Sequence, residues 1–189
     1  MIDAGIKFPT RGDYTNYNVI ENVLLYMFQI PTDSYPDRKP VPIHFYGIPY
    51  IGYPPKAEDV ITQFEAIRKR QRCIIPQQIW HMELSFPIVF EDLTSPYFYF
   101  ADEIARLFCW RYPVCYAYHD KNRETKNRHS HFHFGISTSS YIADYPPLDA
   151  TRFQSYLAQM PAIAQAYGVH LYHFQTKEEL KCLNLSTIF

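Results

Sequence analysis

Four of the eight histidines in this 189-residue chain lie between positions 119 and 133, and three of them alternate with other residues. His129, His131 and His133 would share one face of a β-strand, because side chains at every second position point the same way. A strand-like run ends at His119, and a polar connection, residues 120–128, separates it from the second run. This pattern predicts a β-hairpin in which His119 meets His131 and His133. Three imidazoles that converge on one face are the arrangement that a divalent metal requires.

We take His119, His131 and His133 as the metal ligands. Asp120 follows the first of them and is expected to be a catalytic residue that orients its imidazole, since a ligand histidine usually donates its second N–H to a carboxylate or a carbonyl. No cysteine pair joins the cluster, so three neutral imidazoles with open positions indicate a catalytic site rather than a closed structural zinc site. Such a site can hold Mn²⁺, Mg²⁺ or Zn²⁺, with water and phosphate oxygens completing the shell. His129 is left as a fourth donor, a phosphate contact or a residue without a role.

The elements that must position this hairpin alternate between helix and strand. Helical spacing of apolar residues, with caps and breakers, predicts helices over residues 19–30, 56–72, 94–109 and 149–167, the last kinked by a proline at 161. Alternating or apolar runs predict strands at residues 43–46, 78–86, 113–119, 129–138 and 169–174, while residues 1–17 hold either a short strand or an ordered arm. The strand 78–86 carries His81 and Glu83 on its more polar face, and either of them is a further ligand or an outer contact of the metal site.

One hairpin among mixed helices and strands favours an α+β fold with a mainly antiparallel sheet and helices packed on one face. Phe132, Phe134 and Ile136 would lie beneath those helices, and the histidines would lie on the open face. The length indicates one domain over residues 1–189, with a core from about 18 to 175, because a chain of this size can bury a sizeable hydrophobic core.

The charge and the cysteines limit the partners and the compartment. A net charge of −1 gives no overall basic field that would attract a polyanion. A local basic patch, Arg123, Lys126 and Arg128, surrounds the proposed site and is the expected DNA contact. The four cysteines are scattered without a CxxC pair, and no signal-peptide pattern or membrane-length apolar run occurs. We therefore expect a cytoplasmic protein without a membrane partner.

Two motifs resemble those of a known family. Tyr-Ala-Tyr-His at 116–119, followed by His-Phe-His-Phe-Gly-Ile-Ser at 131–137, resembles the third motif of plasmid mobilisation relaxases. These are metal-dependent HUH-type endonucleases that nick single-stranded DNA at a transfer origin. The segment 80–87, with a histidine before an apolar-Ser-Phe ending, and the helix-like residues 19–30 also resemble elements of this family. The resemblance extends over nearly the full chain and implies a relaxase-like nuclease domain.

The resemblance implies that His119, His131 and His133 hold the metal and that Tyr26 is the nucleophile. The implied reaction is a transesterification in which the Tyr26 oxygen attacks the scissile phosphate, releases a 3′-hydroxyl and keeps a 5′-phosphotyrosyl link. The implied partners are single-stranded DNA at a transfer or replication origin and accessory mobilisation proteins. This chain departs from the family in Ser137, where many members have Asn, and in a longer connection between the two histidine strands.

Other interpretations stay open. The chain is also compatible with a rolling-circle replication initiator-like HUH nuclease and with another metal-dependent phosphoesterase that activates a water instead of a tyrosine. A third alternative is a non-catalytic module that keeps the fold and binds DNA. The proposed nucleophile has rivals in the predicted loops, which are Tyr14, Tyr17, Tyr46, Tyr50 and Tyr53.

Overall fold

The computed structural model describes residues 1–9, 14–47, 52–72, 75–91, 94–121 and 128–173. Its strands are β1 (Ile2–Lys7), β2 (Ile43–Tyr46), β3 (Ile79–Ser85), β4 (Val114–Lys121), β5 (Arg128–Ser137) and β6 (Val169–His173). Within these ranges they form one six-stranded sheet in the order β2-β4-β5-β3-β1-β6. The pair β1–β6 is parallel and the other neighbouring pairs are antiparallel. The prediction of an α+β fold with a mainly antiparallel sheet is therefore confirmed, with one parallel pair that makes the sheet mixed.

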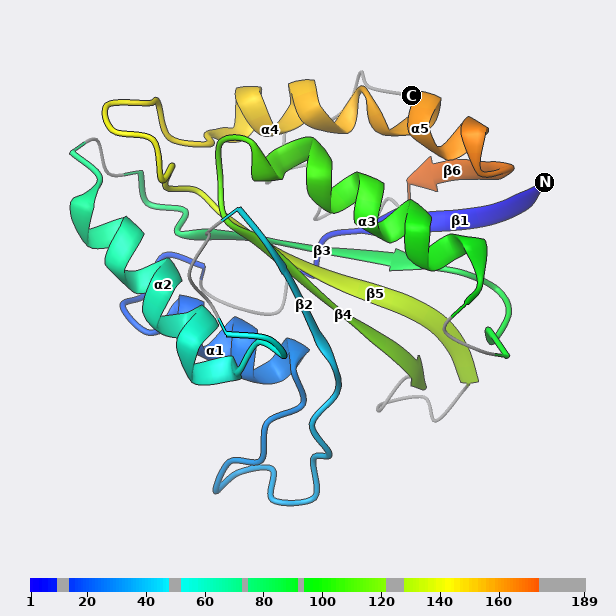
Figure 1. Ribbon diagram of the computed structural model, residues 1–189, viewed down its shortest axis with the longest axis horizontal. Helices are drawn as coiled ribbons and strands as arrows, with labels where there is room; N and C mark the ends of the chain where they lie inside the picture. The colour runs from blue at the N-terminus through cyan, green and yellow to red at the C-terminus, as the bar shows by residue number, and fades with distance from the viewer. Residues whose placement is uncertain (10–13, 48–51, 73–74, 92–93, 122–127, 174–189) are drawn as a thin grey trace.

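Helices cover both sides of this sheet. Those of the first side are α3 (Pro96–Cys109), α4 (Ala150–Leu157) and α5 (Met160–Ala166), and those of the second side are α1 (Val19–Met27) and α2 (Ala57–Arg70). Figure 1 shows α1 and α2 as a pair at one corner, away from α3, α4 and α5. In the described part of the chain, no helix combines the length and the apolar character that crossing a membrane demands.

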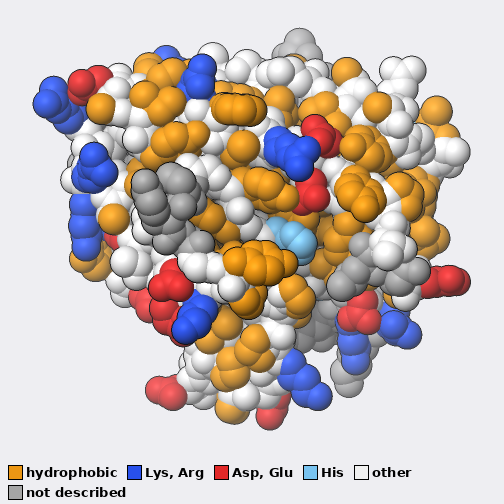
Figure 2. All heavy atoms as spheres, viewed as in Figure 1, with side chains coloured by type: hydrophobic (Ala, Val, Ile, Leu, Met, Phe, Trp, Pro, Cys, Tyr) orange, Lys and Arg blue, Asp and Glu red, His pale blue; other side chains and the backbone are white. Residues whose placement is uncertain are grey.

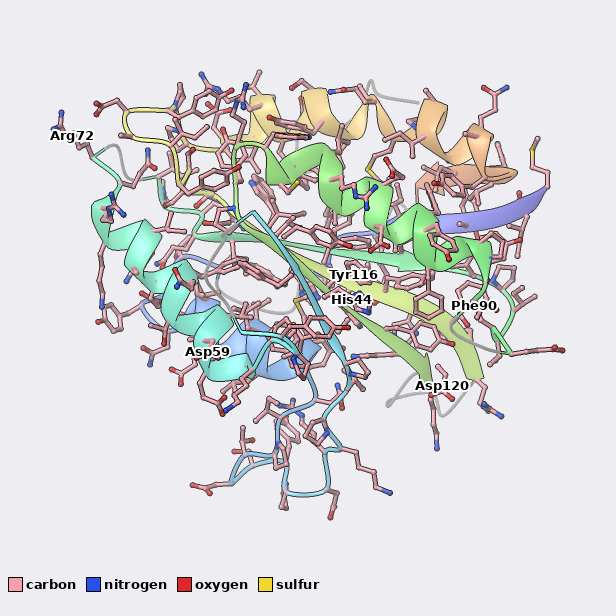
Figure 3. The ribbon with its side chains drawn as sticks, in the orientation of Figure 1. His44, Asp59, Arg72, Phe90, Tyr116 and Asp120 are labelled. Atoms are coloured by element: carbon pink, nitrogen blue, oxygen red, sulfur yellow. The ribbon has the colours of Figure 1, made fainter. Side chains whose placement is uncertain are left out.

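The first side holds the larger core, and the phenylalanine face of β5 lies there beneath helices, as predicted. Phe132, Phe134 and Ile136 of β5 are fully buried there. Figure 2 shows hydrophobic side chains over much of the face that is viewed, with a small pale-blue patch of histidine near its middle. Figure 3 places His44 beside Tyr116, and their rings stack with centroids 4.3 Å apart. His44 therefore belongs to aromatic packing, which agrees with a structural role for this histidine.

The second side is the one that carries the histidines, and it is not open. Along β4 and β5 the histidines share this face with Cys115, Ala117 and Gly135, all of which lie under α1 or α2. A half-face of small and apolar side chains must be removed from water, and the amphipathic α1 supplies the cover. The prediction that helices pack on one face only, with the histidine face open, was therefore wrong. The buried residues of α1 are Val19, Ile20, Leu24 and Met27.

The predicted last helix is two helices. α4 ends at Leu157 and α5 begins at Met160, and Pro161 lies in the first turn of α5. A proline removes one backbone donor and clashes with the preceding turn, but it fits the first turn of a new helix at little cost. The proline therefore separates two helices instead of kinking one.

The first residues of the chain form an inner strand rather than an arm. β1 pairs with β3 on one side and with β6 on the other. Ala4 and Ile6 are buried in the larger core. The sheet thus begins before residue 18 and reaches His173, whereas residues 174–189 lie outside the described ranges.

We predict that Gly135→Val destabilises the protein by about 1–3 kcal/mol, because overpacking forces neighbours to move. A Cβ at Gly135 would lie 3.1 Å from Leu24 Cδ2, 3.2 Å from Met27 Sδ and 3.3 Å from Cys115 Sγ. Urea unfolding of the variant measures the change. Gly52→Val is the matched control, since nothing lies within 4 Å of a Cβ built at Gly52. Equal stabilities of the two variants would contradict the close packing of α1 against β5 at Gly135.

Candidate metal centre

Pairing of β4 with β5 brings three histidines together. His119 lies opposite His131, and His133 lies two residues further along β5 on the same face. Each of the three offers a ring nitrogen, and these nitrogens all lie within 4.8 Å of one another. The residues are 8%, 3% and 1% exposed, respectively. The predicted ligand set is therefore brought together, and its imidazoles can hold a metal ion.

The partners of His119 and His131 define which nitrogen of each ring is free. His119 Nε2 lies 2.7 Å from the carbonyl oxygen of Met27, and His131 Nδ1 lies 3.1 Å from the carbonyl oxygen of His129. A carbonyl only accepts hydrogen bonds, so these two nitrogens carry the protons of neutral rings. The lone pairs are then on Nδ1 of His119 and on Nε2 of His131. Such a second N–H held by a backbone carbonyl is typical of a metal-ligand histidine.

His133 has one ring nitrogen with a hydrogen-bonding neighbour and one without. Its Nδ1 lies 2.9 Å from Nε2 of His81. Its Nε2 is buried and has no hydrogen-bond partner among the described residues. A buried polar atom without a partner is unfavourable unless something else, such as an ion, meets it there. The donor set therefore fits a metal at the centre of the three rings.

Burial keeps these imidazoles neutral. Desolvation lowers the pKa of His131 to about 4, and it also lowers the pKa of His119 and takes that of His133 well below its usual value. The neighbouring imidazoles act in the same direction on His131 and His133. Only the neutral ring offers a lone pair, so the cluster is held in its metal-binding form near pH 7.

One buried carboxylate stands beside the three rings. Glu83 is 4% exposed, and its Oε2 lies 4.0 Å from Nε2 of His133. Lys7 Nζ lies 2.9 Å from Oε1 of Glu83, and the Ser85 hydroxyl donates to the same oxygen at 2.7 Å. Burial would raise the pKa of Glu83, but the hydrogen bonds from Ser85 and Lys7 and the charge of Lys7 outweigh it and lower the pKa. Glu83 is therefore an anion at the edge of the cluster.

The charged residues predicted around the hairpin lie further out. Asp120 is at the end of β4 (Figure 3), and its Oδ2 accepts a hydrogen bond from Nη2 of Arg128 at 3.1 Å. Both side chains are more than half exposed. The His119 ring is hydrogen-bonded to the backbone carbonyl of Met27 in α1 rather than to the Asp120 carboxylate. Arg123 and Lys126, the other predicted DNA contacts, lie outside the described residues.

Two tyrosines contact the histidines. The ring of Tyr26, on α1, meets His133 and His81 edge-on, with centroids 5.3 Å and 5.9 Å away. The residue is 40% exposed, so it borders both the cluster and solvent. The hydroxyl of Tyr14 lies 3.2 Å from Nδ1 of His81. Tyr26, the predicted nucleophile, is thus placed beside the proposed ligands, and Tyr14 joins it.

The remaining rival tyrosines differ in their surroundings. Tyr46 donates to Asp102, and Tyr17 is 72% exposed beneath the Arg68 guanidinium. Tyr53 is 97% exposed. Tyr50 lies outside the described residues.

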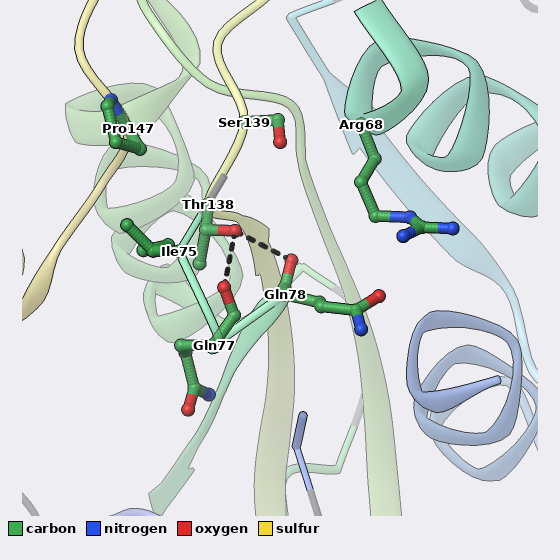
Figure 4. Close-up of a pocket in the computed structure, with 7 residues that line it drawn as sticks. All are labelled: Arg68, Ile75, Gln77, Gln78, Thr138, Ser139 and Pro147. Atoms are coloured by element: carbon green, nitrogen blue, oxygen red, sulfur yellow. Dashed lines mark hydrogen bonds between the residues drawn. The ribbon is translucent and has the colours of Figure 1, made fainter. Parts of the chain in front are cut away.

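The pocket in Figure 4 is separate from the histidine cluster. It lies where β3 begins and β5 ends, and the Thr138 hydroxyl donates to the carbonyl oxygens of Gln77 and Gln78 there, at 2.9 and 3.0 Å. No histidine lines it. The lining residues are Arg68, Ile75, Gln77, Gln78, Thr138, Ser139 and Pro147.

Sequence reasoning left His81 open as a ligand or an outer contact, and it missed the link to Tyr14. The structure makes His81 an outer contact, because its Nε2 faces the ring of His133. The alternation of apolar and polar residues along β3 placed His81 on the same face as Glu83, and this was the sequence signal for its role. Tyr14 gave no local signal, because 67 residues separate it from His81 in the sequence.

We predict that replacing any of the three ligands by alanine weakens binding of Mn²⁺ or Zn²⁺ by more than the roughly 10–100-fold typical of an outer-shell partner. His119→Ala, His131→Ala and His133→Ala test this by titration calorimetry. His170→Ala is the matched control, because that exposed histidine pairs with Asp3 away from the cluster. Wild-type affinity in the three ligand variants would rule out a metal at this position.

We also predict that the metal-free protein loses stability as the pH falls from about 6.5 towards 4. Burial lowers the pKa of both His81 and His131 from 6.5 to about 4. Between about pH 6.5 and 4 the unfolded chain therefore takes up protons at these two histidines and the folded chain does not. The free energy of unfolding falls as the pH drops through this range, and the contribution of the two neutral rings to it is complete only above about pH 6.5. Urea unfolding across the window measures the slope, which should be shallower in His131→Ala. A flat profile in the wild type would contradict burial of these rings in the folded state.

No family model, no curated protein and no solved structure matches this chain. We therefore infer its function from the histidine cluster and the side chains around it.

Proposed function

We propose that this chain is a metal-dependent, relaxase-like endonuclease that cleaves single-stranded DNA by tyrosine transesterification, with Tyr26 as the nucleophile. The observation that carries the proposal is the contact between the Tyr26 ring and His133, whose buried Nε2 has no hydrogen-bond partner in the part of the chain that the structure describes. A phenol beside a metal-ligand imidazole is the pairing that transfer of a phosphodiester to tyrosine needs. The likeness of the two histidine strands to the relaxase motif supports the same reaction.

His119, His131 and His133 would hold the metal, with Glu83 beside them as a source of negative charge. A bound divalent cation supplies Lewis-acid catalysis by polarising a phosphoryl oxygen. We propose Mn²⁺ or Zn²⁺ rather than Mg²⁺, because Mg²⁺ prefers oxygen ligands and retains water, whereas imidazole suits transition metals.

In the proposed step the Tyr26 oxygen forms a bond to phosphorus, and the bond from phosphorus to the 3′-oxygen breaks. The phenolic proton leaves to water or a neighbouring base, and the departing 3′-oxygen takes up a proton. One phosphodiester replaces another, so the reaction can run backwards and reseal the strand. A phenol is a weak nucleophile at its ordinary pKa of about 10, and it needs nearby positive charge. The Arg38 guanidinium, 5.7 Å from the centroid of the Tyr26 ring, can supply that charge and meet a DNA phosphate.

A second candidate function is hydrolysis of a phosphodiester by water. Glu83 favours it, because a buried anionic carboxylate beside His133 Nε2 is suited to accept a proton from an attacking water. The metal ligands would be the same. The products differ, because hydrolysis leaves no DNA attached to the protein.

The proposed partners are single-stranded DNA at a transfer origin and accessory mobilisation proteins. A rolling-circle replication origin would use the same chemistry. Arg128, exposed at the start of β5, is one described residue of the proposed DNA contact. A cytoplasmic location agrees with the free thiols of Cys109 and Cys115.

We predict a covalent protein–DNA adduct when the protein meets single-stranded oligonucleotides of randomised sequence and Mn²⁺. Because the phosphotyrosyl link holds the 5′ end of the downstream fragment, a 3′ label should migrate with the protein on a denaturing gel and a 5′ label should not. Tyr26→Phe should abolish the adduct. Tyr53→Phe is the matched control, since that side chain is almost fully exposed, and it should leave the adduct unchanged.

Each other outcome changes the assignment. Cleavage without an adduct favours the hydrolytic candidate. An adduct that persists in Tyr26→Phe would show that another tyrosine is the nucleophile. DNA binding without cleavage favours the non-catalytic module.

A further inference from the structure

A chain of hydrogen bonds through Tyr14 and His81 leads from the N-terminal segment to Nδ1 of His133, the ring nitrogen that faces away from the proposed metal. It begins at the carbonyl oxygen of Pro9, which lies 2.6 Å from the Tyr14 hydroxyl. A carbonyl oxygen has no proton to give, so the hydroxyl donates its single proton to Pro9. The Tyr14 oxygen is then left as an acceptor.

The next link is His81. Its Nδ1 lies 3.2 Å from the Tyr14 oxygen, which can only accept, so Nδ1 carries a proton. His81 is 5% exposed, and its burial disfavours the charged ring. A neutral imidazole carries one proton, and therefore Nε2 of His81 is an acceptor.

The last link fixes His133. Nε2 of His81 lies 2.9 Å from Nδ1 of His133, and an acceptor on His81 requires the proton to be on His133 Nδ1. The lone pair of His133 is then on Nε2, the buried nitrogen that no described residue meets with a hydrogen bond. We infer that Tyr14 and His81 are positioning residues that hold His133 in the one tautomer able to bind a metal through Nε2.

The chain of hydrogen bonds from Pro9 through Tyr14 and His81 to His133 is called the relay below. The backbone around Tyr14, where the relay begins, is itself held in place by hydrogen bonds. The backbone N–H of Gln78 donates to the carbonyl oxygen of Tyr14 at 3.2 Å. The Gln78 side-chain amide donates to the carbonyl oxygens of Thr15 and Asn16 at 3.0 and 2.9 Å. Gln78 is held in turn by Thr138, whose hydroxyl bonds the Gln78 carbonyl (Figure 4). Gln78, the residue just before β3, thus fixes the backbone from which Tyr14 reaches His81.

The three proposed ligands differ in how they are oriented. His119 and His131 donate to backbone carbonyls, which no single substitution removes. His133 depends on two other side chains, so its tautomer can be changed by mutation without touching a ligand. If Tyr14 and His81 only filled space, substitutions that preserve their shape would leave metal binding unchanged.

The test compares His81→Gln with His81→Phe. The amide oxygen of glutamine can accept from His133 Nδ1 near the position of the lost Nε2, whereas phenylalanine keeps a ring but offers no acceptor. We expect His81→Phe to weaken Mn²⁺ binding by about 10–100-fold and His81→Gln to restore most of the loss. Affinities equal to that of the wild type in both variants would overturn the inference.

Tyr14→Phe provides an independent arm. Without the hydroxyl, the His81 proton is free to move to Nε2, and His133 then has to place its own proton on the metal-facing nitrogen. We expect weaker Mn²⁺ binding in this variant, and an adduct yield that recovers at saturating Mn²⁺ because Tyr26 is intact. Tyr17→Phe is the matched control in the same segment and should bind Mn²⁺ as the wild type does.

Long-range ¹H–¹⁵N NMR of the metal-free protein reads the tautomer directly and does not require a variant that folds. The wild type should show His133 and His81 protonated at Nδ1, and a proton on His133 Nε2 would overturn the inference. The inference rests on the metal centre of the proposed function but not on its DNA chemistry. Loss of the adduct with intact metal binding would therefore count against the nuclease alone, whereas unchanged metal binding in His81→Phe would count against the relay alone.

Discussion

The C-terminal turn of α1 is the constraint on which the site depends. Met27 is the last residue of this helix, and the final carbonyl groups of any helix have no partner within it. His119 Nε2 donates a hydrogen bond to the Met27 carbonyl oxygen at 2.7 Å, and this bond connects the helix to β4 at the histidine cluster. The preceding residue, Tyr26, lays its ring against His133. One turn of helix thus covers the histidine face, orients a proposed ligand and carries the proposed nucleophile.

The charges around the cluster suit a cation better than an anion. Its three imidazoles are buried and neutral, so they offer lone pairs and no positive charge to attract a phosphate directly. The C-terminal end of α1 carries the partial negative charge of the helix dipole, and Glu83 adds a carboxylate. A metal would reverse the sign of the site and let it bind a phosphodiester. The metal is therefore the link between this set of buried residues and the phosphate chemistry that we propose.

Strand periodicity was sufficient to predict that His119, His131 and His133 converge on one face, but it did not predict that a helix covers that face. A period of two residues puts His131 and His133 on one face whatever the rest of the fold does, and the apolar run before His119 gave the partner strand. The same face also carries Cys115, Ala117 and Gly135, whose need for cover becomes evident only when β4 and β5 lie side by side. An amphipathic helix shows its apolar stripe in the sequence but not the surface that receives it. Reading the sheet strand by strand therefore predicted an open face where α1 is packed.

Pairing between strands that are distant in the sequence explains two other features that were not predicted, the β1–β6 pair and the position of Glu83. The parallel pair β1–β6 joins the two ends of the described chain, and no local pattern reports such a contact. The position of Glu83 opposite His133 follows from the register between β3 and β5, which neither segment specifies alone. Once that register is set, His81 falls two residues from Glu83 on the same face and meets the second nitrogen of the His133 ring.

The coupling of these elements bears on how the site works as a unit. Any movement of α1 away from the sheet would break the bond between His119 and Met27 and would carry Tyr26 away from His133 in the same motion. The segment before α1 carries Tyr14, which reaches His81 behind His133. Residues 14–27 therefore orient two of the three proposed ligands, His119 and His133, from outside the hairpin that contains them. Orientation of the proposed ligands and placement of the tyrosine are then two consequences of the same packing of residues 14–27 on the sheet, because this segment both orients those histidines and carries the proposed nucleophile.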